Sequence, residues 1–240
     1  MIAGVSLREL GVTMKWSDKL GEGVERYAGK AARKKVLAGR EMLGASPDPM
    51  AVAKWVSGAI TKLDELNDED TNREILYVCS DKFPSDKVEA LRDLYLESGS
   101  VDALFSVMDK DQSWYGLSYY ESPKRKGRVI HVTKIPFNPK GCEDAADELE
   151  RRYHYCHCPL VKELIRHPEQ KISRTFCYCS SGWYRSLWEG ILGEPVRVDV
   201  VKTVLQGDDR CSFVIRLPPG TRTKTPPAKA RAKGRKTQTV

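Results

Sequence analysis

Five cysteines in the second half of the chain have the side-chain type and the spacing that could do chemistry. Two Cys-x-Cys pairs, Cys156 with Cys158 and Cys177 with Cys179, each follow an aromatic residue, and Cys211 comes later. Each pair directly precedes a predicted helix start, in "CPLVKELI" and "CSSGWYRSLWEGIL", where Ser180 or Ser181 would cap the second helix. The N-terminus of a helix stabilises a thiolate and lowers its pKa. We therefore expect both pairs to be ready for metal binding or nucleophilic attack.

The same five cysteines are the candidate metal ligands. Cys158, Cys177, Cys179 and Cys211 would form a closed four-thiolate structural zinc site, with Cys156 as a spare ligand. One Cys-x-Cys pair is a weaker zinc signal than Cys-x₂-Cys, but two pairs and a fifth cysteine strengthen it. An iron–sulfur cluster also takes cysteine ligands, although these spacings do not match its common motifs. The alternative is that five small thiols only pack a core.

An enzyme could use several of these residues differently. The thiolate of Cys158 or Cys177 would attack an electrophilic carbon, with His157 or His154 as the base. A zinc ion with an open position could instead activate water. Either histidine is also a candidate additional metal ligand. The sequence leaves catalysis open.

An aromatic helix follows the second cysteine pair and is the candidate wall of a small-molecule pocket. Trp183, Tyr184, Leu187 and Trp188 recur there at helical spacing, which places them on related faces. Such residues more often form ordinary core. Cys79, at the end of an apolar run, is expected to pack without a chemical role.

The first half of the chain, residues 1–112, has the patterns of a helical region. Helices are predicted from apolar spacing, with Pro49 at a first helical position and Ser85 as an N-cap. Their predicted ranges are 17–43, 49–63, 70–79, 85–97 and 101–108.

Residues 113–218 have the mixed pattern of an α+β domain. "YGLSYYES" and "RVIHVTKIPF" flank "PKRKG" and predict a β-hairpin, and a second hairpin is predicted at 195–217 with Gly207 and Asp208 in its turn. Between the hairpins, "CEDAADELERRYHY" and "CPLVKELIRHP" each predict a helix. The expected fold is an antiparallel sheet with packed helices.

Positive charge concentrates at the end of the chain. The formal net charge is +7, but residues 221–240 hold seven Lys and Arg and no acid, so the remaining 33 basic residues balance the 33 acidic ones. Residues 219–240 are predicted to be a disordered tail, which either binds nucleic acid weakly and without sequence preference or only increases solubility. No stretch reaches membrane-span length, so we expect a cytoplasmic protein without membrane contact. A homodimer is left open.

Residues 177–211 resemble the end of the 4-vinyl-reductase-type ligand-binding domain. The matching features are a cysteine, a Gly-aromatic helix, a Leu-Gly-x-x-Val turn into a strand and a closing Gly-x-x-x-Cys. The resemblance places the zinc positions of the phenol-sensing members on Cys177, Val200, Thr203 and Cys211. Only the outer two are cysteines here, so the resemblance implies that a metal would recruit Cys179, Cys158 or Cys156 instead.

Residues 115–217 also resemble a little-characterised prokaryotic Cys-rich family and, more loosely, the L-2-amino-thiazoline-4-carboxylic acid hydrolase family. The shared features are Cys158-Pro159, Cys177 and the stretch from Gly207 to Phe213. The resemblance implies helices on an antiparallel sheet over an apolar pocket. The second Cys-x-Cys departs from the hydrolases, which have an acidic residue nearby. The expected function is a zinc-binding, sensor-like domain for a small molecule; the alternative is a hydrolase of the 2-amino-thiazoline-carboxylate type.

Overall fold

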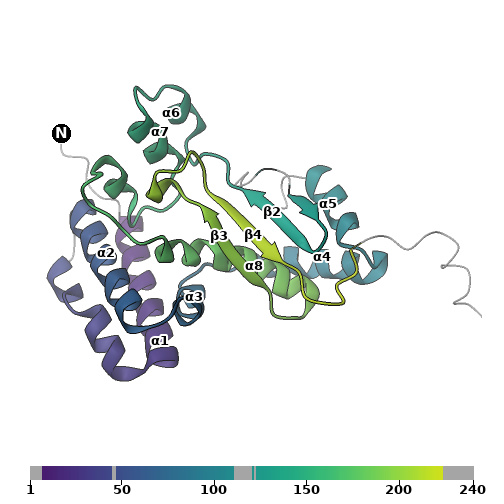
Figure 1. Cartoon of the computed structure of the whole chain (residues 1–240), viewed down its shortest axis with the longest axis horizontal. Coiled ribbons are helices and arrows are strands. Elements are labelled where there is room, and N and C mark those ends of the chain that lie inside the picture. The colour runs from purple at the N-terminus through teal and green to yellow at the C-terminus, as the bar shows by residue number, and fades with distance from the viewer. Residues whose placement is uncertain (1–6, 45–46, 111–120, 122, 224–240) are drawn as a thin grey trace, which may run out of the picture.

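The first three helices of the chain gather at one end of the molecule, and a four-stranded antiparallel sheet lies toward the other end, beside the fourth and fifth helices (Figure 1). This computed structural model describes residues 7–44, 47–110, 121 and 123–223. The predicted α+β class, with a helical first half, is confirmed.

The first helix folds back on itself, and the second helix packs beside it. Helix α1 spans Leu7–Leu37 and is interrupted at Gly29, where φ is 87°, so that its end returns to its beginning and Arg40 pairs with Asp18 at 2.8 Å. It ends before the predicted residue 43 because Gly39 adopts a left-handed conformation, after which a short 3₁₀ turn follows. Helix α2, Pro49–Leu66, begins as predicted, with the Asp48 carboxylate accepting from the Ala51 amide at 2.9 Å.

Three further helices complete the first half, and they confirm the predicted positions. They are α3 (Glu69–Val78), α4 (Ser85–Ser98) and α5 (Val101–Lys110). The predicted N-cap at Ser85 is wrong, because Ser85 is already helical and Pro84 takes the cap position without a side-chain hydrogen bond.

The beginning of helix α5 also corrects the predicted tail. The first amides of a helix lack partners within the helix. Here the amides of Val101 and Asp102 donate to the carbonyls of Arg222 and Thr223, at 3.1 and 3.3 Å. The prediction of disorder is therefore wrong for these two residues, and residues 224–240 lie outside the described ones.

The sheet has the strand order β1-β2-β4-β3, and all neighbouring strands are antiparallel. Its strands are β1 (Lys124–Lys126), β2 (Val129–Thr133), β3 (Arg197–Lys202) and β4 (Ser212–Arg216). The second hairpin is confirmed, with Gly207 left-handed in its connection. The first hairpin turns at Gly127, so part of the expected turn is strand β1. Most of "YGLSYYES" lies outside the described residues.

The segment between the hairpins is broken into short pieces. The predicted helix over 142–155 is two helices, and the one predicted over 158–168 is only a 3₁₀ turn. The pieces are α6 (Pro139–Glu143), α7 (Glu148–Tyr155), η3 (Lys162–Arg166), η4 (Arg174–Cys177) and the longer α8 (Tyr178–Leu192). A further turn, η5 (Val204–Gln206), lies within the second hairpin.

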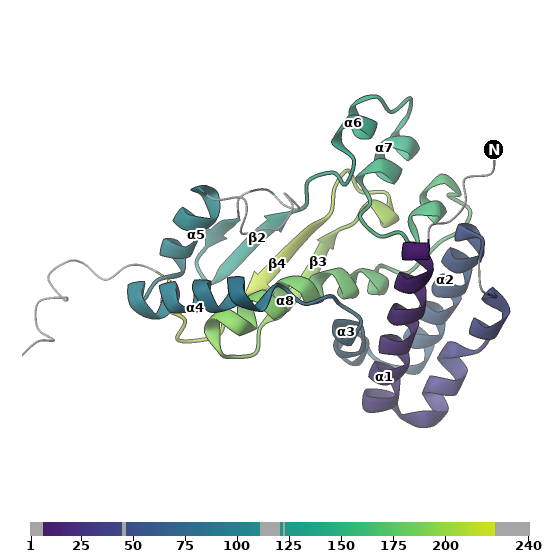
Figure 2. The same ribbon diagram turned by 180° about the vertical axis from the view of Figure 1, so that it is seen from behind.

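Helix α8 joins the two ends of the molecule. It packs on β3 and β4, and it also contacts α3 and α4 (Figure 2). Gly182 permits close approach to α3, since a Cβ there would lie 2.7 Å from Ser80 Cβ and 3.2 Å from Tyr77 Cα. One continuous core therefore runs from Trp16 to Leu217, across the domain boundary expected at residue 112.

Tyr77 on α3 fastens the outer edge of strand β3. Its hydroxyl donates to the Val198 carbonyl at 3.0 Å and accepts from the Val198 amide at 3.2 Å. Both outward-facing backbone groups of Val198 thus have partners, and the helical half is tied to the sheet.

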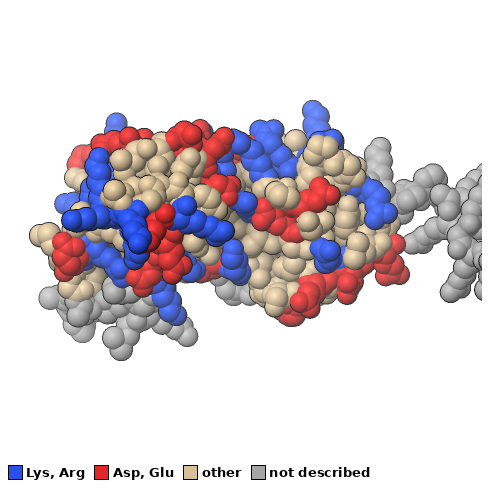
Figure 3. All heavy atoms as spheres, turned by 90° about the horizontal axis from the view of Figure 1, so that it is seen from below, with Lys and Arg blue, Asp and Glu red and all other residues tan. Residues whose placement is uncertain are grey.

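Acidic and basic side chains intermingle on the face of the molecule seen in Figure 3. Ion pairs in the described part of the chain, such as Arg40 with Asp18 and Arg185 with Glu74, also join opposite charges. The pattern agrees with the neutral balance of the chain before its basic tail. Within the described part of the chain, no helix is long and apolar enough to cross a membrane.

The contact of Gly182 with α3 predicts the effect of one methyl group. Gly182→Ala should lower the free energy of unfolding by about 1–3 kcal/mol, because the new Cβ overlaps Ser80 and backbone of α3. Gly58→Ala is the matched control: the exposed Gly58 has open space in α2, so stability should rise by up to about 1 kcal/mol. Chemical denaturation measures both, and equal effects would contradict the predicted close packing.

Candidate functional site

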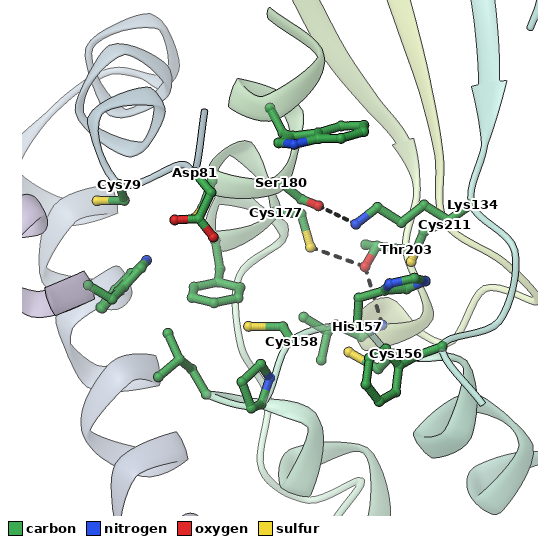
Figure 4. Close-up of a pocket in the computed structure, with 18 of the residues that line it drawn as sticks. Cys79, Asp81, Lys134, Cys156, His157, Cys158, Cys177, Ser180, Thr203 and Cys211 are labelled. Atoms are coloured by element: carbon green, nitrogen blue, oxygen red, sulfur yellow. Dashed lines mark hydrogen bonds between the residues drawn. The ribbon is translucent and has the colours of Figure 1, made fainter. Parts of the chain in front are cut away.

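A pocket of about 380 Å³ lies where the helical half meets the sheet half. Its walls include Trp16 on α1, the start of α8, and Phe213 on β4 (Figure 4). The segment that follows α7 closes another side. Residues from both halves of the chain build these walls. The domain predicted over residues 113–218 therefore does not form the pocket by itself.

Six of the seven cysteines line this pocket. The structure brings together all five predicted site cysteines and adds Cys79, which was expected only to pack. The six are Cys79, Cys156, Cys158, Cys177, Cys179 and Cys211. Cys142 lies outside, where its thiol donates to the Arg151 carbonyl at 3.3 Å.

The two Cys-x-Cys pairs enter the pocket from different helix ends. Cys156 is the C-cap of α7 and Cys158 lies in the turn that follows, so the predicted helix N-terminus at the first pair is wrong. The second pair does lie at a helix start. There the cap is Cys177 and α8 already begins at Tyr178, not at the predicted serines.

Burial keeps the pocket thiols protonated, which corrects the prediction of low-pKa cysteines. Desolvation raises the pKa of Cys156 and of Cys179 to about 11 each. It also raises the pKa of Cys158, Cys177 and Cys211, with the neighbouring thiols adding to the effect for Cys158 and Cys177. The loss of water around the sulfur atoms therefore outweighs any benefit from the helix terminus.

Thr203 joins two of the predicted cysteines. Its hydroxyl lies 3.2 Å from the thiol of Cys177, and it also accepts from the Leu205 amide at 3.3 Å. Hydrogen bonding to Thr203 also acts to lower the pKa of Cys211 against the larger effect of burial. Cys177, Thr203 and Cys211 thus surround one part of the pocket (Figure 4). Val200, the fourth position implied by the sensor resemblance, is buried core instead.

The thiols offer suitable donors for a soft metal, but their arrangement does not form a coordination shell. Among the described residues, no three His, Cys, Asp or Glu side chains are placed to hold a metal ion. The predicted four-thiolate zinc site is therefore not assembled in this conformation, and zinc binding stays a prediction.

Of the four histidines, one lines the pocket and three do not. His157 lines the pocket, and its Nε2 donates to the Ile135 carbonyl at 2.7 Å. Burial, helped by the nearby Lys134 cation, lowers the pKa of His157 to about 4, so the ring is neutral at pH 7. His154 does not line the pocket and pairs with Asn138, which removes it as a candidate base or ligand there. His167 is also absent from the pocket wall.

Two of the four residues predicted to form the aromatic wall line the pocket. Trp183 and Tyr184 line the pocket, whereas Leu187 and Trp188 are fully buried core on other faces of α8. Leu187 and Trp188 therefore do not form the expected wall of this pocket. Helical spacing alone did not distinguish the pocket-facing side of α8 from the sides that pack.

Lys134 and Ser180 are polar pocket residues that sequence reasoning missed. The Lys134 ammonium donates to the Ser180 hydroxyl at 2.6 Å, and both side chains line the cavity. A lysine directly after a β-strand pattern suggests a solvent-exposed position, so the local sequence carried no signal. For Ser180 the sequence predicts only a helix-cap role.

The neutral state of His157 predicts an acid-dependent loss of stability. A pKa of 6.5 in the unfolded chain and about 4 in the folded chain means that the stabilisation is complete above pH 6.5 and is lost as the pH falls toward 4. This contribution is up to about 3 kcal/mol. Urea unfolding of His157→Gln should show a shallower decline over that window, with His167→Gln as the control. Parallel declines in the wild type and His157→Gln would contradict the assignment.

Comparison with known proteins gives one family match. No curated protein matches the chain. Residues 140–220 match a family model described as "Family of unknown function (DUF6144)", and the matched stretch contains the five predicted site cysteines. This similarity covers about one third of the chain.

Proposed function

We propose that this protein binds a small, mainly apolar molecule in the cysteine-lined pocket. The observation that carries the proposal is the cavity itself: about 380 Å³, bounded mainly by aromatic rings, apolar side chains and thiols, with a smaller number of charged and polar side chains. Small-molecule sites usually have this size and composition. Thiol groups contribute weakly polar, polarisable surface and leave most of the wall apolar.

The way that the walls are held together supports a preformed site. The Trp16 ring on α1 packs against Phe176 with their centroids 5.7 Å apart, and Tyr184 on α8 packs against Phe213 on β4 at 5.0 Å. Rigid aromatic surfaces reduce the ordering cost of binding. A ligand here would contact both the helical half and the sheet.

The resemblance to the 4-vinyl-reductase-type domain gives a second line of support. Three of the four positions implied by that resemblance, Cys177, Thr203 and Cys211, border the pocket. In the sensors these positions accompany a small-molecule site. A ligand-binding role is therefore favoured over a purely structural one.

The protonation states of the pocket cysteines and of His157 favour ligand binding over a hydrolase that uses a cysteine. Cys158 and Cys177 have raised pKa values, so their reactive thiolate forms are scarce at pH 7. His157 uses Nε2 on the Ile135 carbonyl and has a pKa of about 4. A base with that pKa is a poor match for deprotonating such a thiol.

Phenylnaphthylamine, an uncharged fluorescent probe of apolar sites, tests the proposal. It should bind the full-length protein saturably at one site per chain. Ser180→Phe, which adds a ring inside the pocket, should weaken this binding at least about tenfold, a loss of about 1.4 kcal/mol. Ser85→Phe, at an exposed position on α4, should have little effect. No saturable binding, or equal binding to both variants, would overturn the proposed function.

Cysteine labelling locates the probe independently. Bound phenylnaphthylamine should slow alkylation of Cys177 and Cys211 by iodoacetamide at pH 9, as measured by mass spectrometry of peptides. Cys142 lies outside the pocket and is the internal control. Equal slowing at Cys142 would indicate general stabilisation instead of occupancy of the pocket.

A soft-metal site is a second candidate function, favoured by the thiol cluster. Cys156, Cys177 and Cys211 lie close enough that the thiolate charges formed by deprotonation would interact. Zinc binding would require these side chains to turn toward a common ion and to lose their protons, at a cost increased by burial. The cluster also includes Cys158, whose charge interacts with those of Cys156 and Cys177.

Metal analysis distinguishes this second candidate. Purified, untagged protein should contain about one zinc per chain, and Cys211→Ser should lose the metal and unfolding stability while Cys142→Ser keeps both. Protein prepared with zinc in the buffer that still contains none, and whose Cys211→Ser variant is as stable as Cys142→Ser, would rule out a structural zinc site.

A further inference from the structure

Lys134 is held in the pocket wall by contacts of both its backbone and its side chain. It follows strand β2 directly, and its amide donates to the Cys211 carbonyl at 2.9 Å. Its side chain reaches toward the start of α8, where the ammonium donates to Ser180 (Figure 4). The backbone and the side chain are both held, so the charge has a defined position.

The positive charge of Lys134 lacks a carboxylate partner among the described residues, where no Asp or Glu oxygen lies within ion-pair distance. Asp81 is the acidic residue of the pocket wall, and it pairs with Lys19 at 3.2 Å. The Ser180 hydroxyl is neutral. A half-buried cation is costly unless an opposite charge balances it.

The charge faces groups that cannot balance it as they stand. Electrostatic interaction links Lys134 to His157 and to the thiols of Cys156, Cys177 and Cys179. Burial keeps these thiols protonated and the imidazole neutral. An anionic ligand would supply the counter-charge that these described residues do not provide.

The surroundings of Lys134 also suit an anion geometrically. An ammonium group has three N–H donors, and Ser180 uses one of them. Ser180 is the third residue of the 15-residue helix α8, whose N-terminus carries partial positive charge. The Phe213 ring lies 5.9 Å from the ammonium, so apolar surface begins directly beside the charge.

We infer that the pocket selects an amphiphilic anion, with a carboxylate or sulfonate bound by Lys134 and Ser180 and an apolar, preferably aromatic body against Phe176, Trp183 and Phe213. This inference rests on the proposed binding function and defines its ligand class. Lys134 provides the preference for negative charge, and the aromatic wall provides most of the contact area.

Two probes with nearly the same skeleton test the charge preference. Anilinonaphthalene sulfonate carries the negative charge, and phenylnaphthylamine lacks it. Fluorescence titration of Lys134→Met should show sulfonate affinity reduced about 10–100-fold, as expected for losing a hydrogen bond to a charged group, with phenylnaphthylamine affinity within about twofold of wild type. Lys134→Arg should retain sulfonate binding. Lys54→Met, on the exposed face of α2, is the matched control.

The outcomes separate this inference from the proposed function. If phenylnaphthylamine binds and Lys134→Met weakens both probes equally, or neither, the charge preference is wrong while the pocket function stands. If Lys134 instead balances a thiolate, Lys134→Met will slow alkylation of Cys177 and leave the ratio of the two affinities unchanged, which also overturns the inference. If neither probe binds wild type, the proposed function and this inference both fail.

Discussion

Helix α8 is packed against α3 on one side and against strands β3 and β4 on the other, and the rest of the structure depends on that double contact. The contact with α3 is close because Gly182 has no side chain to separate the helices. It also fixes the first turn of α8, which carries Cys177, Cys179 and Ser180. Close packing at Gly182, which has no reactive side chain, thus sets the geometry of the pocket.

Much of the fold follows from local signals, and the errors occur where tertiary contacts decide. As predicted, Pro49 begins helix α2 and the left-handed Gly207 lies in the connection of the second hairpin. The segment after α7 is different: its apolar pattern predicts a helix, but it closes the pocket and forms only a 3₁₀ turn. Intrinsic helix preference is weak compared with the burial of a wall residue.

The cysteines of the candidate site could be predicted from the sequence, but their protonation states could not. Repetition of Cys-x-Cys singled out five cysteines that the fold does bring together. Their pKa values could not be anticipated, because desolvation depends on walls supplied by residues far away in the sequence, such as Trp16. Lys134 was missed for the same reason: its partner Ser180 is 46 residues away.

The hydroxyl of Tyr77 has a consequence for how copies of this protein could associate. Strand β3 is an outer strand of the described sheet, and exposed strand edges can recruit another chain. Because Tyr77 occupies both the amide and the carbonyl of Val198, that edge cannot be extended by a neighbouring strand without displacing helix α3. The sheet is therefore closed on this side, and growth through β3 would first require separating the helical half from the sheet.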